Sequence, residues 1–424
     1  MKNKLVLAFL VGGAAGVAAG CQTYDFEPVE PLAIAQTTQA KTVAGRQLKP
    51  NLMFLIDKSG SMNFAADDSA PTCTPKCNQS VNGMAPVLCA ATCPTRIQAL
   101  KTAMGNFLTA NSTLAWMGMA IFPTGVEVNN AVDACGATSS ADIKVRLETK
   151  PDDLPADLSA SSALVNSEIQ KLSAFGGTPT GGSLAFIGTY PDLLDPDPKI
   201  PRDDFVLLLT DGLPNCNIAN MNNCNNAAAC RCTLGAITSC MSTPKFCTQG
   251  CLDKDNSEAQ VTGLRGKNIK TIVIGFGAET AAGDGPDTLN ALAEAGGFAR
   301  ACGEEDGGFS NSRCGPGNTC DPVTKLCSRK FYQATNSAEL ASVLADISKA
   351  IDPLSICNYK LDDIPGDPSL LSVVIDGVNS PGNTADTWTY SGGRVTFVGA
   401  LCAKVTAATP IAPVRVEFRI VNSL

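Results

Sequence analysis

The sequence contains no histidine among its 424 residues. Without an imidazole the chain cannot form a Ser-His-Asp triad, an HExxH zinc protease site or a C-x-x-C-H haem attachment site. The absence removes the hydrolytic mechanisms that secreted enzymes use most often.

Positive charge is also in short supply. The chain has 32 lysines and arginines against 40 aspartates and glutamates, which gives a formal net charge of −8. Nucleic-acid phosphates require a basic surface, so we expect no nucleic-acid partner. The hydrophobic fraction of 44% and the charged fraction of 17% are typical of a globular protein with a buried core.

Cysteine, in contrast, is abundant, with 19 residues. In an exported protein this density indicates disulfides. The N-terminus predicts export, because Lys2 and Lys4 precede an apolar run, Leu5 to Leu10, and then small residues. This pattern is a secretory signal peptide, and it is too short to be a membrane span.

The leader ends in Ala-Ala-Gly followed by Cys21, which resembles the bacterial lipobox. The resemblance implies removal of residues 1–20 and lipidation of Cys21; the alternative is an ordinary signal peptide with a chance cysteine. By analogy with enteric bacteria, Gln22 after the cysteine favours the outer membrane. We therefore expect an outer-membrane lipoprotein exposed on the cell surface, held to the membrane by its lipid anchor, with residues 21–48 as a polar tether.

Residues 49–351 alternate between apolar strand patterns and amphipathic helix patterns. Thr95 and Asn336 stand where two helices begin, each with Gln or Glu three residues later, as in a capping box. Strands alternating with helices predict a doubly wound α/β fold with a mainly parallel sheet. The expected strands are 51–57, 114–122, 141–149, 204–211, 270–277 and 330–335, and the expected helices are 95–111, 163–175, 286–297 and 336–351.

Three cysteine-rich insertions interrupt this alternation, at about 65–95, 213–253 and 301–329. They are poor in apolar residues, so disulfides rather than hydrophobic burial must fix them. We expect Cys135 to pair with the second insertion and Cys357 to pair with Cys402. The first insertion contains Cys73, Cys77, Cys89 and Cys93. Zinc binding by these four cysteines is the less favoured alternative, because an oxidising compartment favours disulfides.

Residues 352–424 have a different pattern. Apolar and polar residues alternate at period two, turn residues separate the segments, and no helical pattern is present. This predicts a small C-terminal antiparallel β unit, either as a separate sandwich or packed onto the α/β domain.

Oxygen-bearing side chains stand at the ends of two predicted strands, where the stretch DKSGSM follows the first strand and an Asp ends LLLTD. Carboxyl ends of parallel strands share one edge of a sheet, which is where such folds bind ligands. An all-oxygen set with two carboxylates suits Mg²⁺ or Mn²⁺, and Ca²⁺ less well. Phosphate is a weaker alternative, because GGTPTGG lacks the Lys-Ser/Thr ending of a P-loop, and simple turns are another. The candidate side chains are Asp57, Ser59, Ser61, Thr178, Thr180 and Asp211.

Together, DKSGSM, GGTPTGG and LLLTDG resemble a von Willebrand factor A domain with its metal-ion-dependent adhesion site. The resemblance implies direct ligation by both serines and by the threonine, with the aspartates acting mostly through water and an acidic group of the partner completing the octahedron. The implied metal residues are Asp57, Ser59, Ser61, Thr178 and Asp211, with Thr180 as a supporting residue.

We therefore expect a cell-surface adhesin or receptor that binds an acidic group on a protein or polysaccharide. The lipoprotein architecture also resembles the contact-gliding adhesins of myxobacteria, which implies attachment during surface motility. The alternative is a scaffold that assembles a complex with other envelope proteins. We expect no enzyme, because no base, lysine or second metal cluster accompanies the Asp and Ser residues.

Overall fold

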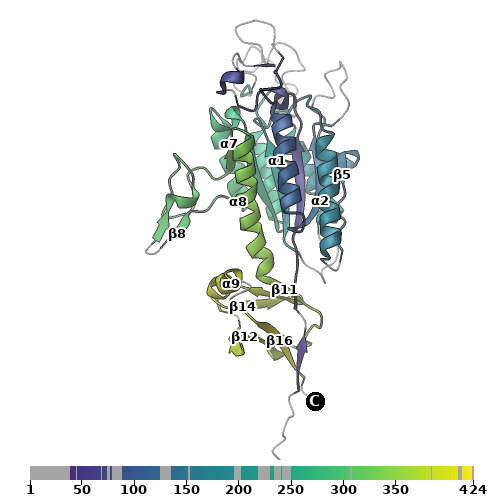
Figure 1. Ribbon diagram of the computed structural model, residues 1–424, viewed down its shortest axis with the longest axis vertical. Coiled ribbons are helices and arrows are strands. Elements are labelled where there is room, and N and C mark those ends of the chain that lie inside the picture. Colours follow the sequence, from purple (N-terminus) through teal and green to yellow (C-terminus); the bar gives the residue numbers. More distant parts are fainter. Residues whose placement is uncertain are drawn as a thin grey trace, which may run out of the picture.

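A computed structural model describes residues 39–43, 45–67, 69–73, 77–78, 88–124, 135–150, 153–194, 202–217, 230–233, 240, 250–305, 308–382, 384–408 and 413–422. These residues form a larger α/β domain and a smaller β unit, stacked end to end (Figure 1). The expected signal peptide, the expected lipidation at Cys21 and the tether before residue 39 lie outside the described residues. Within the described part, no helix combines the length and apolar character that crossing a bilayer requires.

The central sheet has the strand order β10-β7-β6-β3-β4-β5. All neighbouring pairs are parallel except β4 and β5, which are antiparallel. The predicted α/β class with a mainly parallel sheet is thus confirmed. The strands are β3 (Asn51–Asp57), β4 (Trp116–Phe122), β5 (Ile143–Val145), β6 (Asp204–Thr210), β7 (Ile269–Phe276) and β10 (Tyr332–Ala334).

Helices cover both faces of this sheet, which explains why the central residues of its inner strands are apolar. In β3, Leu52, Phe54 and Ile56 join one buried cluster, while Met53 and Leu55 join the other. Side chains of α1 and α8 pack into the first cluster, and side chains of α3, α6 and α7 pack into the second. The helices are α1 (Arg96–Ala110), α2 (Pro155–Gln170), α3 (Thr180–Ile187), α6 (Lys254–Arg265), α7 (Gly285–Ala295) and α8 (Ser337–Ile356).

Helix boundaries follow local capping chemistry where the sequence carries it. Thr95 caps α1 with Gln98 in a complete capping box, and Asn336 accepts a hydrogen bond from the backbone N–H of Glu339 at 2.9 Å. Helix α6 was not predicted, because Val261 and Leu264 are the large apolar residues that it buries and they give too sparse a pattern.

Disulfides hold the insertions as expected, and the zinc alternative for the first insertion is wrong. Its four sulfurs form two disulfides and are therefore not available as thiolate ligands. The third insertion carries a hairpin of β8 (Gly303–Glu305) and β9 (Gly308–Ser310), which projects from the side of the domain (Figure 1). The described pairs are 73–93, 77–89, 135–216, 230–251, 232–240, 302–320, 314–327 and 357–402; the remaining two cysteines of the second insertion, Cys224 and Cys247, lie outside the described residues.

The C-terminal unit consists of two four-stranded sheets, with orders β1-β16-β12-β13 and β14-β15-β11-β2. An aromatic cluster lies between them, with the Tyr359 ring centroid 4.9 Å from that of Phe397 and 5.3 Å from that of Phe418. The strands are β1 (Gln39–Val43), β2 (Gly45–Gln47), β11 (Asn358–Leu361), β12 (Leu371–Ile375), β13 (Val378–Ser380), β14 (Trp388–Ser391), β15 (Arg394–Phe397) and β16 (Val416–Asn422).

Two expectations about this unit are corrected. The tether was expected to extend to residue 48, but β1 pairs with β16 and β2 pairs with β11, so the strand pairing begins at Gln39. The polar sequence hid this because the partner strands stand at the other end of the chain. The unit also contains a helix, α9 (Gly399–Thr406), whose Leu401 and Val405 cover the sandwich core.

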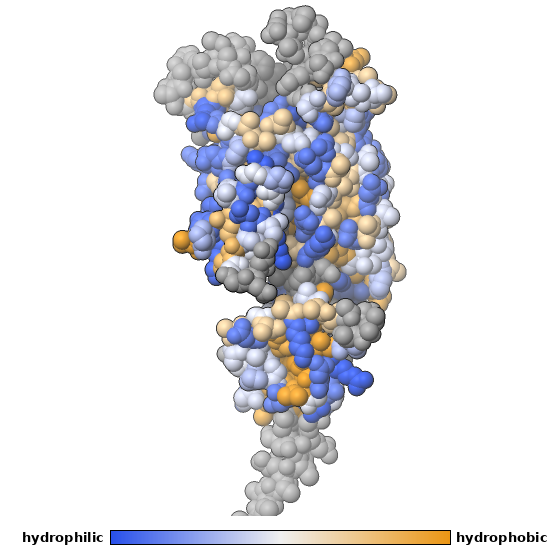
Figure 2. Space-filling view, turned by 60° about the vertical axis from the view of Figure 1, so that its left-hand side comes forward, coloured by the Kyte–Doolittle hydropathy of each residue, from blue (hydrophilic) through white to orange (hydrophobic). Residues whose placement is uncertain are grey.

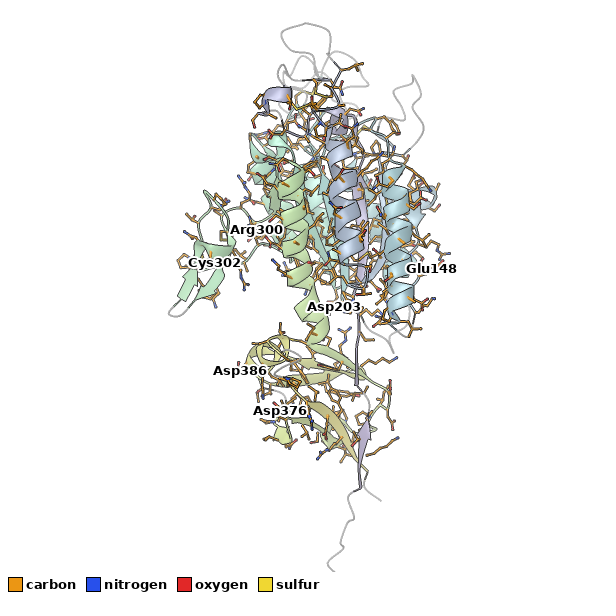
Figure 3. All side chains as sticks on the ribbon, viewed as in Figure 1. Glu148, Asp203, Arg300, Cys302, Asp376 and Asp386 are labelled. Carbon is orange, nitrogen blue, oxygen red and sulfur yellow. A yellow bond between two sulfur atoms is a disulfide. The ribbon has the colours of Figure 1, made fainter. Side chains whose placement is uncertain are left out.

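The α/β domain is thus inserted into the sandwich, and two connections join them. One is the short segment between β2 and β3, and the other is α8, which leads directly into β11. At the junction, Asp203 accepts a hydrogen bond from Asn358 Nδ2 at 3.0 Å and lies 3.7 Å from Arg394 Nη1 (Figure 3). In Figure 2 the two parts are a larger and a smaller body, with polar and apolar residues interspersed on the described surface. Strand β3 starts at this junction, so its carboxyl end lies at the opposite end of the domain.

The strand assignment of residues 39–43 predicts a difference between neighbouring residues. Val43 is 5% exposed and belongs to the sandwich core, whereas Thr42 is exposed. We expect Val43→Asp to lower the free energy of unfolding by at least about 2 kcal/mol, because it buries an unpaired carboxylate. We expect Thr42→Asp to lower it by about 1 kcal/mol or less. Denaturant titration measures both free energies of unfolding. Equal small effects would contradict the strand assignment and favour the sequence-based prediction that residues 39–43 belong to the tether.

Candidate metal centre

The first loop of the site follows β3 directly. Asp57 is fully buried at the end of the strand, and its Oδ1 accepts a hydrogen bond from the backbone N–H of Ser59 at 2.7 Å. Its Oδ2 accepts one from Thr210 Oγ1, also at 2.7 Å, from the neighbouring strand β6. Ser61 lies in the short 3₁₀ helix η1 (Gly60–Asn63). The turn after β3 thus fixes one carboxylate oxygen of Asp57, and strand β6 fixes the other.

The two serine hydroxyls converge with Asp211 from the next loop. Ser59 Oγ and Ser61 Oγ are 3.1 Å apart, and Asp211 Oδ1 is 2.8 Å from Ser61 Oγ and 3.4 Å from Ser59 Oγ. Asp211 follows the last residue of β6 and is fully buried. Because β3 and β6 are parallel neighbours, these two strand ends meet at one edge of the sheet.

Thr178 is held against the same edge by the loop that follows Asp211. An ideal Cβ on Gly212 would lie 3.8 Å from Ser61 Oγ and 4.0 Å from Thr178 Oγ1, so the two hydroxyls flank the same glycine. The backbone N–H of Thr178 donates to Asn215 Oδ1 at 2.7 Å. Thr180, the first residue of α3, lies behind it, with Oγ1 3.5 Å from the carbonyl oxygen of Thr178.

The spacing of these oxygens fits a small divalent cation. An octahedral Mg²⁺ or Mn²⁺ with metal–oxygen distances of about 2.1 Å holds adjacent ligand oxygens about 3 Å apart. The pairs Ser59–Ser61 and Ser61–Asp211 have oxygen separations of 3.1 Å and 2.8 Å. The donor set around them is hard oxygen alone, which suits these ions and disfavours soft metals.

Burial of the two carboxylates creates a strong electrostatic demand for a cation. Burial, with the nearby charge of Asp211, raises the pKa of Asp57 to about 7, although hydrogen bonds from Ser59 and Thr210 act in the opposite direction. Burial also raises the pKa of Asp211, while the charge of Arg96 lowers it. A cation bound between the two carboxylates would relieve this cost by offsetting their charge.

Sequence reasoning missed three side chains at this site. Thr210 donates to Asp57, and Asn215 positions Thr178. Arg96, 0% exposed, places Nη1 3.0 Å from Asp211 Oδ2. Arg96 did carry a signal, because it is a basic residue at the first position of a helix, where the helix dipole disfavours positive charge. Nothing in the sequence distinguished Thr210 or Asn215 from ordinary strand-end and turn residues.

A disulfide cross-links the loops that follow β4 and β6. Cys135 bonds to Cys216, the residue after Asn215, across a sequence separation of 81. Asn215 also donates its backbone N–H to the carbonyl oxygen of Thr178 at 3.0 Å. The disulfide therefore supports the residue that holds the candidate threonine.

The fold and the side chains at its carboxyl edge define a doubly wound α/β domain with an all-oxygen candidate cation site. No protein-family model and no curated protein matches the sequence. Among solved structures, the chain is similar to the PilB minor pilin from Streptococcus sanguinis, with a TM-score of 0.37 and 17% identity over 72% of this chain and 62% of the pilin.

It is also similar to the pilus adhesin SpaC from Lactobacillus rhamnosus GG, with a TM-score of 0.39 and 12% identity over 88% of this chain and 39% of SpaC. A third similar structure is the manganese-loaded TRAP protein of Plasmodium vivax, with a TM-score of 0.34 and 14% identity over 72% of this chain and 74% of TRAP. The chain thus spans less than two thirds of the pilin and of SpaC. The fold class itself follows from the strand order and the two helical layers.

Loss of the Cys135–Cys216 disulfide should loosen Thr178 specifically. We expect Cys135→Ser/Cys216→Ser to accelerate amide hydrogen exchange at Thr178 by about tenfold or more, because Asn215 loses its anchor. As a matched control, Cys302→Ser/Cys320→Ser removes a disulfide from the projecting insertion and should leave the Thr178 amide unchanged. Equal exchange at Thr178 in the parent and the first variant would show that Asn215 is held without the disulfide.

Proposed function

We propose that the chain is a cell-surface adhesin or receptor that binds an acidic group of its partner through Mg²⁺ or Mn²⁺. Asp57, Ser59, Ser61, Thr178 and Asp211 would hold the ion. The observation that carries the proposal is the convergence of Ser59, Ser61 and Asp211 oxygens within 2.8 to 3.4 Å of one another at the carboxyl edge of the sheet. This is the arrangement expected of the metal-ion-dependent adhesion site of a von Willebrand factor A domain.

The donor set favours recognition of an external carboxylate. Ser59 is 1% exposed, whereas Ser61 and Gly212 are partly exposed, so one side of the candidate site borders solvent. Hydroxyl ligands carry no charge, and a cation held mainly by them keeps much of its positive charge. A carboxylate from a protein or an acidic polysaccharide is the group that such a cation attracts most strongly.

The arrangement of the two parts supports display of the site away from an anchor. The described chain enters the sandwich at Gln39, at the end of the molecule opposite to the candidate site (Figure 1). A lipid on Cys21 would then hold the protein to the outer membrane by the sandwich and present the cation site outward. We propose attachment during surface gliding as the setting, by the resemblance to the contact-gliding adhesins of myxobacteria.

We propose binding rather than catalysis. The sequence has no histidine, and Arg96 is paired with two carboxylates. Burial lowers the pKa of Lys58 to about 8, but its Nζ lies 3.5 Å from the centroid of the Phe175 ring. These contacts leave neither basic side chain positioned as a proton acceptor for a bound substrate.

The metal proposal is tested first by stability. At a free Mg²⁺ or Mn²⁺ concentration 100 times the dissociation constant, we expect the free energy of unfolding of the parent to rise by about 2.7 kcal/mol, and EDTA to reverse the gain. Asp57→Ala and Ser61→Ala should lose the gain, because Ser61 supplies a ligand hydroxyl and Asp57 supplies a carboxylate that holds the ion mostly through water. Ser69→Ala, which removes an exposed hydroxyl hydrogen-bonded to Asp67, should keep it. If neither ion changes the free energy of unfolding of the parent, the proposed cation site is contradicted.

The partner proposal is tested by adhesion. In Mn²⁺ we expect purified protein to bind immobilised polyglutamate and not polyglutamine, and to lose this binding in EDTA or in Asp57→Ala. Cells that produce Asp57→Ala at the parent level should adhere less to surfaces. The scaffold alternative predicts another result, in which adherence is retained and other envelope proteins become unstable when the chain is deleted.

A further inference from the structure

Arg96 occupies a position that opposes two general trends. It is the first residue of α1, where the positive end of the helix dipole disfavours a cation, and its side chain is fully buried. Burial by itself would lower the pKa of its guanidinium, but the carboxylates of Asp211 and Glu279 offset that effect and raise the pKa. A residue that violates local preferences in this way marks a site where its charge serves a purpose.

The guanidinium of Arg96 occupies space that a side chain at position 277 would fill, and that residue is a glycine. Gly277 has a φ of 102°, and an ideal Cβ on it would lie 2.8 Å from Arg96 Nε and 2.9 Å from Cζ. Arg96 Nε has no hydrogen-bond partner among the described residues. A side chain at position 277 would therefore clash with the guanidinium, whose Nη1 contacts the carboxylates of Asp211 and Glu279.

Asp211 divides its two oxygens between the candidate cation site and Arg96. Oδ1 lies near the hydroxyls of Ser59 and Ser61, while Oδ2 accepts from Arg96 Nη1 at 3.0 Å. Glu279, in the 3₁₀ helix η7 (Ala278–Ala281) after β7, forms an ion pair with the same Nη1, and its side chain is 45% exposed. Three loops of the carboxyl edge are thus joined by one positive charge.

We propose that Arg96 is a positioning residue whose charge sets the affinity of the candidate site for its metal. Glu279 moderates this effect by compensating part of the charge of Arg96. This inference rests on the proposed metal site. Arg96 neutralises Asp211 when the metal is absent, and it opposes the metal by charge repulsion when the metal is present. Glu279 weakens that repulsion, because it takes part of the charge of the guanidinium.

Two opposite effects follow from removing the two charges. Arg96→Gln removes a positive charge adjacent to the ligand Asp211, so the dissociation constant for Mn²⁺ should fall by about tenfold or more. The same variant should unfold at a lower temperature in EDTA, because Asp211 stays buried without its partner. Glu279→Gln removes one of the two carboxylates that compensate the positive charge of Arg96, so the dissociation constant for Mn²⁺ should rise severalfold.

The experiment compares the full chain carrying Arg96→Gln, Arg96→Lys, Glu279→Gln and the double variant Arg96→Gln/Glu279→Gln. Mn²⁺ affinity is measured by titration calorimetry, and thermal unfolding is measured in EDTA. Arg96→Lys keeps the charge, so its Mn²⁺ affinity should stay near that of the parent, and the double variant should return toward the parent because its net charge is restored. Glu294→Gln, which neutralises another partly exposed glutamate that is paired with Lys330, is the matched control and should leave Mn²⁺ affinity unchanged.

The outcomes separate this inference from the proposed function. If the parent binds no Mn²⁺, both the proposed metal site and the proposed role of Arg96 are contradicted. If the parent binds Mn²⁺ but Arg96→Gln and Glu279→Gln change its affinity in the same direction or not at all, the proposed function stands and the role of Arg96 is overturned. Should Arg96→Gln fail to fold, Arg96→Lys and Glu279→Gln decide between these outcomes, since the latter changes a half-exposed side chain.

Discussion

The constraint on which the rest of the site depends is the burial of two carboxylates side by side. Asp57 ends β3 and Asp211 follows β6, two neighbouring strands whose central residues are apolar, and both aspartates are fully buried. Charge at this depth is costly unless donors and cations surround it. The hydroxyl of Thr210, the backbone N–H of Ser59 and the guanidinium of Arg96 supply part of that compensation. A divalent cation between the same oxygens supplies the remainder in the proposed loaded state.

Compensation of this kind requires loops that do not move apart, and those loops have little apolar surface to bury. The chain fixes them covalently, with a disulfide after β6 that supports Asn215 and, through it, Thr178. Cross-linking restricts the unfolded chain and holds the loop geometry without a hydrophobic core of its own. The Cys135–Cys216 disulfide and the polar site thus serve the same requirement, which is to hold hydroxyls and carboxylates in place at the edge of a sheet.

The sequence predicted most of the α/β domain, because apolar runs such as that of β3 and capping residues such as Thr95 are local signals. It also predicted that Ser59, Ser61 and Asp211 would lie together, because parallel strand ends share an edge, while their role as metal ligands stays a prediction. It did not predict Arg96 as part of the site, since only the fold brings the start of α1 to Asp211. Strand β1 escaped prediction for a similar reason: its polar sequence becomes a strand only beside β16, from the far end of the chain.

The insertion of the α/β domain into the sandwich connects the two ends of the molecule in a particular way. Strand β3 begins shortly after β2, following residues 48–50, and ends at Asp57. A short connection and one strand therefore lead from the sandwich to the candidate metal site. Its hydrogen-bonded neighbours β4 and β6 support it on both sides. In the proposed adhesin, tension between a partner at the site and an anchor before Gln39 acts along this central strand. Strands β3 and β6 are the two central strands of the six-stranded sheet, so the strands that lead to Asp57 and Asp211 both have hydrogen-bonded neighbours on each side that resist such tension.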